Sequence, residues 1–188
     1  MIDIGYVIRV IVLAWRRRAA KKMKNIWAES VVTGRCWPND LDINMHMNNA
    51  RYLREADFGR FALLLDTGLW DVVKVRRKKD LQTSLLAGAI QVQYRQSVEL
   101  GDRFSITTRL AGWDERAFYI EQEITLEKNQ QVACSLLVRI VVTPRSLSPQ
   151  MLVEDLGYGS IESPVLPPAV ENFKQNHRLT FLPLKSKL

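Results

Sequence analysis

The sequence has 188 residues, which is close to the size of one domain and long enough to bury a core without disulfides. Apolar residues make up 47% and charged residues 25%, which excludes disordered, collagen-like and low-complexity chains. Cys36 and Cys134 are too few for a disulfide framework, and His46 and His177 lie too far apart for a zinc motif. We therefore expect both cysteines to be buried as small hydrophobic residues in a reducing compartment.

Lysine and arginine number 27 against 20 acidic residues, which gives a formal net charge of +7. The excess is concentrated in two clusters: Arg16, Arg17, Arg18, Lys21, Lys22 and Lys24, and then Lys74, Arg76, Arg77, Lys78 and Lys79. Basic clusters bind nucleic acid, an anionic membrane or a phosphate-bearing small molecule. No RRM, KH, zinc-finger or helix-turn-helix signature is present, which argues against nucleic acid. A solvated basic face is an equally good interpretation of either cluster alone.

Residues 1–29 form an apolar and basic N-terminal segment. The apolar run from Ile4 to Trp15 is interrupted by Arg9, and its length of about twelve residues is too short for a bilayer that needs about twenty. It also lacks the charged start and the small-residue cleavage site of a signal peptide. We expect a short helix that either lies on anionic lipid or packs on the domain. If it inserted, the basic cluster would keep the chain on the cytoplasmic face of an intracellular membrane.

Residues 30–145 show the strand and helix patterns expected of one α+β domain. Val31 to Trp37 predicts a strand, and a polar loop from Pro38 leads to a helix over 50–67, capped by Asn48 or Asn49 and ended by Gly68. This helix is apolar on most sides, which indicates burial. Alternating runs at 91–95, 104–110, 118–126 and 131–143 predict strands separated by turns. The pattern predicts an antiparallel sheet of about five strands wrapped around one long central helix.

Residues 146–188 are rich in proline and predict an extended surface tail with short helical fragments. The chain ends in Ser186-Lys187-Leu188, which is the pattern of a peroxisomal address read by a receptor. The alternative is that this terminus is accidental and that the N-terminal segment holds the protein at a membrane.

The stretch from Asp40 to Leu53 carries the strongest chemical pattern, because Asp40, Asp42, His46, Asn48 and Asn49 crowd a loop that leads into the buried helix. A helix N-terminus offers free backbone N–H groups and a positive dipole end, which suit a carbonyl oxygen or a developing oxyanion. A nearby carboxylate can act as a nucleophile or as a base on water. The structural alternative is that the aspartates serve the turn, the asparagines cap the helix and the histidine is a satisfied core residue.

The segments DLDINMHMNNARYLREADFGRF and GWDERAFYIE give this pattern a family context. Over roughly residues 30–145 the chain resembles the hotdog-fold acyl-CoA thioesterases of the 4-hydroxybenzoyl-CoA thioesterase type. It is most similar to the animal branch known as thioesterase superfamily member six. The resemblance implies a hotdog fold and a site in a groove at a subunit interface, and therefore a homodimer or a higher homo-oligomer.

The same resemblance assigns roles to residues of the loop. It places the catalytic carboxylate on Asp42 and the N–H that polarises the thioester carbonyl on the backbone of Asn49. His46, Asn48 and Tyr52 occupy positions that shape the loop and the substrate slot. The chain departs from the family at Met45, where a glycine usually stands. Because a residue other than glycine adopts a positive φ at a cost, we expect the loop to follow a different path there.

Glu55 and Asp57 are alternative catalytic residues, because another hotdog subgroup takes its carboxylate from the helix. Against this, Arg51, Arg54 and Arg60 lie on the same helix, and acids so surrounded are usually ion-paired.

The resemblance implies an enzyme that hydrolyses an acyl-CoA thioester to a free acid and CoA. No metal or redox cofactor is implied, and CoA enters as part of the substrate. Residues 74–79 are candidates for contacts with its phosphates. The alternative function is a catalytically silent hotdog protein that binds acyl chains or lipids, or that forms a scaffold on an anionic membrane surface.

Overall fold

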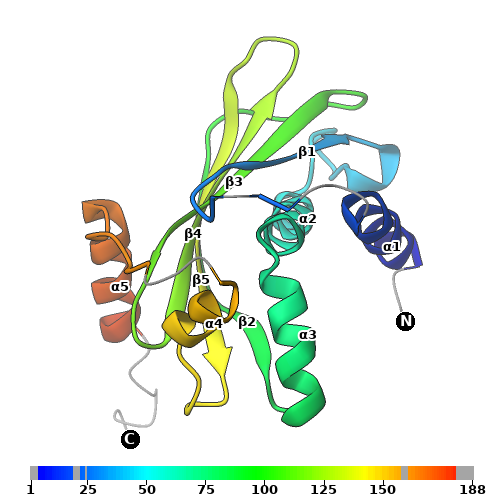
Figure 1. Ribbon diagram of the computed structural model, residues 1–188. Helices are drawn as coiled ribbons and strands as arrows, with labels where there is room; N and C mark the ends of the chain where they lie inside the picture. The colour runs from blue at the N-terminus through cyan, green and yellow to red at the C-terminus, as the bar shows by residue number, and fades with distance from the viewer. Residues whose placement is uncertain (1–3, 19–21, 24, 158–160, 181–188) are drawn as a thin grey trace, which may run out of the picture.

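The computed structural model describes residues 4–18, 22–23, 25–157 and 161–180 (Figure 1). The predicted peroxisomal terminus at residues 186–188 lies outside these residues, as do Lys21 and Lys24, and nothing is described of the His177 side chain.

One five-stranded antiparallel sheet forms the framework. Its strands are, in spatial order, β1 (Ser30–Arg35), β3 (Arg103–Trp113), β4 (Ala117–Leu126), β5 (Val132–Thr143) and β2 (Ser84–Tyr94). β1 and β2 are therefore the two edge strands. Along most of β3 and the second half of β4 the buried side chains alternate, as the period of two in the sequence predicts, whereas the first four residues of β4 are all buried.

The central helix α2 (Asn49–Thr67) lies against one face of this sheet (Figure 1). It begins where the Asn48 side chain accepts a hydrogen bond from the Ala50 N–H, and it ends at Gly68, which has a φ of 85°. Helix α3 (Leu69–Lys79) follows directly. The predicted α+β fold, with an antiparallel sheet around one long central helix, is confirmed.

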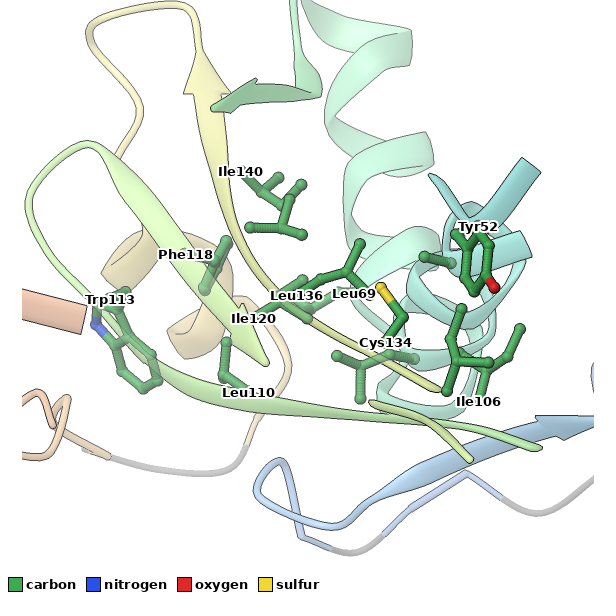
Figure 2. Close-up of a cluster of buried hydrophobic side chains, with 14 of the residues drawn as sticks. Tyr52, Leu69, Ile106, Leu110, Trp113, Phe118, Ile120, Cys134, Leu136 and Ile140 are labelled. Carbon is green, nitrogen blue, oxygen red and sulfur yellow. The ribbon is translucent and has the colours of Figure 1, made fainter. Parts of the chain in front are cut away.

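The core fills the space between α2, α3 and the sheet. Figure 2 shows part of it, where Tyr52 and Leu69 from the helices meet Ile106, Ile120 and other strand residues. Both cysteines are free and buried, as predicted. Burial raises the pKa of the Cys36 thiol to about 11 and that of Cys134 to about 12. Neither thiol is therefore set up to act as a nucleophile at neutral pH.

Helix α1 (Ile4–Arg18) packs on the outer side of α2, which is one of the two arrangements left open by the sequence (Figure 1). The contacts are made by its polar side chains: Tyr6 donates to Asp57, and Arg9 pairs with Glu55. None of its residues is buried. Among the helices of the described ranges, none is long and apolar enough to cross a membrane.

The region after Pro144 differs from the expected surface tail. It contains α4 (Pro149–Asp155) and α5 (Pro168–Thr180), and Leu152 and Val153 of α4 are part of the main core. Helix α5 lies on the face of the sheet opposite α2 and buries Val170 with Tyr119 of β4 (Figure 1). The predicted helical fragments are present as α4 and α5, but the prediction of a surface tail is wrong, because apolar residues of both helices dock on the domain.

Candidate active site

A short turn brings Asp42 beside the N-terminus of α2. The turn is closed by a hydrogen bond of 2.9 Å from the Asp42 N–H to the His46 carbonyl, and Leu41 forms a β-bridge with Met47. One step further out, the Asn48 N–H donates to the Asp40 carbonyl at 2.8 Å. Because these paired residues lead directly into α2, the base of the turn is held against the start of the helix.

The Asp42 side chain is half-buried and has one defined partner. Its Oδ1 accepts the Asn44 N–H at 2.8 Å, which fixes the carboxylate in the turn. Within the described part of the chain Oδ2 accepts no hydrogen bond. One carboxylate oxygen is therefore positioned by the backbone, and the other is available to a water molecule or a substrate.

The first turn of α2 leaves one amide unpaired. The Asn48 side chain accepts the Ala50 N–H at 2.9 Å, and the Arg51 N–H donates to the Asn48 carbonyl. The Asn49 N–H, by contrast, has no acceptor among the residues that the structure describes, and Asn49 is exposed. At a helix N-terminus such an N–H is a donor for a carbonyl oxygen or an oxyanion.

Two tyrosines connect this site to the end of β2. The buried Tyr52 hydroxyl accepts the Val98 N–H at 3.1 Å and donates to the Gln96 carbonyl at 3.3 Å, and burial raises its pKa. The Tyr94 hydroxyl donates to the Asn49 carbonyl at 3.1 Å. Tyr52 thus holds the chain segment after β2 against α2. Tyr94 was not predicted, because its contact with Asn49 depends on the position of β2 relative to the helix.

The acids on α2 are ion-paired, as their arginine neighbours suggested. Glu55 is only 1% exposed, and both of its oxygens accept from Arg9 at 2.6 Å, while Arg54 lies 3.3 Å away. Asp57 accepts from Arg60 at 2.9 Å and from Tyr6. The arginine that binds Glu55 most closely comes from α1, which the spacing within α2 could not reveal.

Asp40 is a buried turn residue rather than a second free carboxylate. It accepts the Trp37 N–H at 2.9 Å and pairs with Arg54 at 2.8 Å. The half-buried His46 side chain makes no hydrogen bond with any described residue. In the described ranges, no three His, Cys, Asp or Glu residues are grouped so that they could hold a metal ion.

The second basic cluster lies on α3, and most of its cations have local partners. Lys74 pairs with Asp71 at 2.7 Å, Arg76 pairs with Asp155 at 2.5 Å, and Arg77 donates to the Thr83 carbonyl. Lys78 and Lys79 are exposed. These contacts hold α3 in place, and they leave two lysines for any external anion.

Comparisons with known proteins identify the family of this chain. Residues 36–171 match the model of the Thioesterase-like superfamily. Protein THEM6 of Xenopus laevis is 35% identical over 170 residues, which cover 90% of this chain and 79% of that protein. The long-chain acyl-CoA thioesterase FadM of Escherichia coli is 29% identical over 105 residues, covering 54% of this chain and 73% of FadM.

A solved structure agrees with this fold. The protein SAV2348 from Staphylococcus aureus, determined in complex with CoA, has a TM-score of 0.56 at 16% identity. The match covers 80% of this chain and 96% of that one.

Met45 has a φ of 61° in the 42–46 turn, so the backbone adopts the left-handed conformation there although the glycine is absent. The expectation that Met45 avoids a positive φ by a different path of the loop is therefore wrong at this residue. Its side chain is 63% exposed and gives up little packing when removed. We expect Met45→Gly to raise the free energy of unfolding by about 0.5–1 kcal/mol, since relief of a left-handed penalty of about 1–2 kcal/mol exceeds the added chain entropy. Urea denaturation measures this change.

Asn44→Gly is the matched control, because Asn44 is the exposed neighbour in the same turn and has no positive φ. That variant gains only chain entropy in the unfolded state and should be less stable by about 0.5–1 kcal/mol. Equal destabilisation of both variants would contradict the assignment of a backbone cost to Met45.

Proposed function

This chain belongs to the Thioesterase-like superfamily, and we propose that it hydrolyses acyl-CoA thioesters to a free acid and CoA. The observation that carries the proposal is that the turn holding the Asp42 carboxylate leads directly into the start of α2, where the Asn49 N–H has no acceptor among the described residues. The activity in the name of FadM and the CoA in the S. aureus structure support the substrate class. Asp42 and Asn49 are the residues to which the family resemblance assigns the catalytic carboxylate and the N–H that polarises the carbonyl.

In this proposal the two groups act on opposite ends of the reacting carbonyl. Asp42 takes a proton from water as the water oxygen bonds to the thioester carbon, or attacks that carbon itself to give an anhydride that water then opens. Negative charge develops on the carbonyl oxygen, which the Asn49 N–H and the helix dipole stabilise. In the first route the C–S bond then breaks and the proton passes from Asp42 to the CoA thiolate. In the second the C–S bond breaks as the anhydride forms, and the thiolate takes a proton from the water that later opens the anhydride.

His46, Asn48 and Tyr52 have supporting roles in the same proposal. The Asn48 side chain occupies the Ala50 N–H and so leaves the Asn49 N–H for the substrate. Tyr52 holds the segment around Val98 that borders the turn. His46 closes the turn through its carbonyl. Glu55 and Asp57 have less support as catalytic acids, because the Glu55 oxygens are bound by Arg9 and those of Asp57 by Arg60 and the Tyr6 hydroxyl.

We expect Asp42→Asn to lower kcat/KM for acyl-CoA by about a hundredfold or more, because it removes the base while keeping the hydrogen-bond acceptor for Asn44. Release of CoA, followed with a thiol reagent, measures the rate, and denaturation measures the fold. Asp80→Asn is the matched control, since Asp80 accepts the Gln82 N–H at 2.9 Å in an equivalent turn. If Asp42→Asn retains activity within about threefold of the wild type, Asp42 is not the catalyst and Glu55 and Asp57 are next.

We further propose that the active form is a homodimer joined along β2. This strand is long and lies at the edge of the sheet, yet it exposes the apolar residues Leu86 and Ile90. Such an edge is a template for pairing with another chain. Because Tyr94 at the end of β2 contacts Asn49, a partner strand there would border the site.

A charge on this edge should separate the subunits. We expect Ile90→Lys to shift the protein from dimer to monomer in analytical ultracentrifugation and to lower hydrolysis with it, because a buried unpaired lysine is costly. Val31→Lys is the control, since Val31 is an exposed apolar residue on the opposite edge strand β1. A wild type that is monomeric and active would contradict this proposal.

The alternative function, a lipid-binding or scaffold protein on a membrane surface, is favoured by one feature of α1. Its apolar side chains face solvent: Ile4, Val7, Ile8, Ile11, Val12 and Trp15 are between 39% and 74% exposed. Arg16 and Arg18 lie in its last turn. An apolar helix face beside basic residues suits the surface of an anionic bilayer. This role is compatible with hydrolysis, because a membrane-bound thioesterase would combine both.

The vesicle experiment for this role uses liposomes with and without phosphatidylserine. We expect the protein to co-sediment with the anionic vesicles and to be released as salt rises, because the basic residues are exposed. Replacing Ile8 and Ile11 by Asp should abolish binding, whereas replacing Leu81 and Val165, which are also exposed, should not. Equal binding by both double variants would show that the apolar face of α1 is not the contact.

A further inference from the structure

A groove of about 490 Å³ lies where α1, β1 and β3 meet, and we call it the arginine groove. It is lined by Arg9, Thr33, Gly34, Arg35, Trp37, Arg103 and Glu127. Three guanidinium groups thus face one carboxylate among the described lining residues. Arg9 contributes little net charge, because both of its terminal nitrogens bind Glu55. The free positive charge of the groove belongs to Arg35 and Arg103.

These two arginines are direct partners in the β1–β3 ladder, and directly opposed residues project from the same face of a sheet. Like charges in this position destabilise a sheet. Arg35 donates to the Gly101 carbonyl at 3.1 Å. The Arg103 guanidinium has no hydrogen bond or ion pair with the described residues. Glu127, the carboxylate among the described lining residues, forms no ion pair with either arginine. A bound anion would stabilise such an opposed arginine pair, and phosphate matches the guanidinium fork.

Trp37 adds an aromatic surface to the same groove. Its side chain is 58% exposed, and the Arg35 guanidinium carbon lies 5.4 Å from the centre of its ring. Exposed indole rings stack on nucleic-acid bases, and they do so without selecting a particular base. Basic groups next to an exposed aromatic ring therefore suit a phosphorylated nucleoside better than a simple anion.

The groove is connected to the candidate active site by Asp40. The carboxylate of Asp40 accepts the Trp37 N–H, and its carbonyl accepts the Asn48 N–H one residue before α2. Trp37 of the groove and Asn48 at the start of α2 are therefore bound by the same residue. A substrate with a nucleotide at one end and a thioester at the other would need two sites that are connected in this way.

We propose that the arginine groove binds the 3′-phosphorylated ADP end of the CoA substrate, with its phosphates on Arg35 and Arg103 and its adenine on Trp37. The inference rests on the proposed thioesterase function. It assigns the nucleotide to this groove rather than to the basic residues of α3, whose Lys74 and Arg76 are occupied by Asp71 and Asp155.

The first experiment is calorimetric titration with adenosine 3′,5′-bisphosphate, which carries the nucleotide without the thioester. Arg103→Gln and Trp37→Ala should each weaken binding by about tenfold, and Arg103→Gln should make binding less dependent on salt. Lys79→Gln is the control with the same change of charge. Arg103→Gln should also unfold at the same or a higher urea concentration than the wild type, because it removes a repulsive cross-strand pair.

The second experiment separates this inference from the proposed function. Arg103→Gln should raise KM for an acyl-CoA and leave KM unchanged for the same acyl group on pantetheine, which lacks the nucleotide. Hydrolysis of acyl-CoA with the same KM in wild type and variant would overturn the inference and leave the function intact. Binding of the bisphosphate through Arg103 without hydrolysis of any thioester would support the groove and reject the function. Loss of binding in Lys79→Gln instead would assign the nucleotide to α3 and overturn the inference.

Discussion

The arrangement of the whole chain depends on the charged side chains that the central helix buries. Glu55, Arg60 and Asp66 lie on α2 at 7% exposure or less, inside a sheet that wraps the helix. A buried charge is costly unless it is paired and hydrogen-bonded. Arg60 finds Gln122 on β4 and Asp57 on its own helix. Arg54 of α2 lies 3.3 Å from Glu55, but the closest partners of the Glu55 and Asp66 carboxylates come from other elements.

Helix α1 supplies these partners, and this explains its unusual orientation. Arg9 binds Glu55, and Arg17 binds Asp66, so the polar side of α1 faces inward. The guanidinium of Arg9 also lies 3.9 Å from the centre of the Phe58 ring. Since the inward side is polar, the apolar side must face outward. A surface that would be unexpected on an ordinary amphipathic helix is thus the direct consequence of buried acids on α2.

The sequence was informative wherever a short-range pattern decides the structure. The helix over 50–67 and the strands β3, β4 and β5 followed from their periods, and the cap at Asn48 followed from its residue type. Most of β2 and the whole of α3 were not predicted. The C-terminal helices were missed as part of the domain, because composition does not show that Leu152 and Val170 find partners on α3 or on the far face of the sheet. The choice between a free and a docked α1 could not be made from its own residues, since the acids it binds lie on α2.

The candidate site shows the same difference between residues that are close in sequence and residues that only the fold brings together. Asp42, Asn48 and Asn49 are close in sequence, so a motif could identify them, whereas Arg35 and Arg103 become neighbours only through the register of β1 and β3. Asp40 connects the arginine groove with the start of α2, although the sequence predicted for it only a place in the turn. Its carboxylate holds Trp37 and Arg54, and its carbonyl holds Asn48. Because one buried carboxyl-bearing residue binds both Trp37 of the groove and the Asn48 N–H at the helix start, the geometry of the groove and that of the candidate site depend on the same residue.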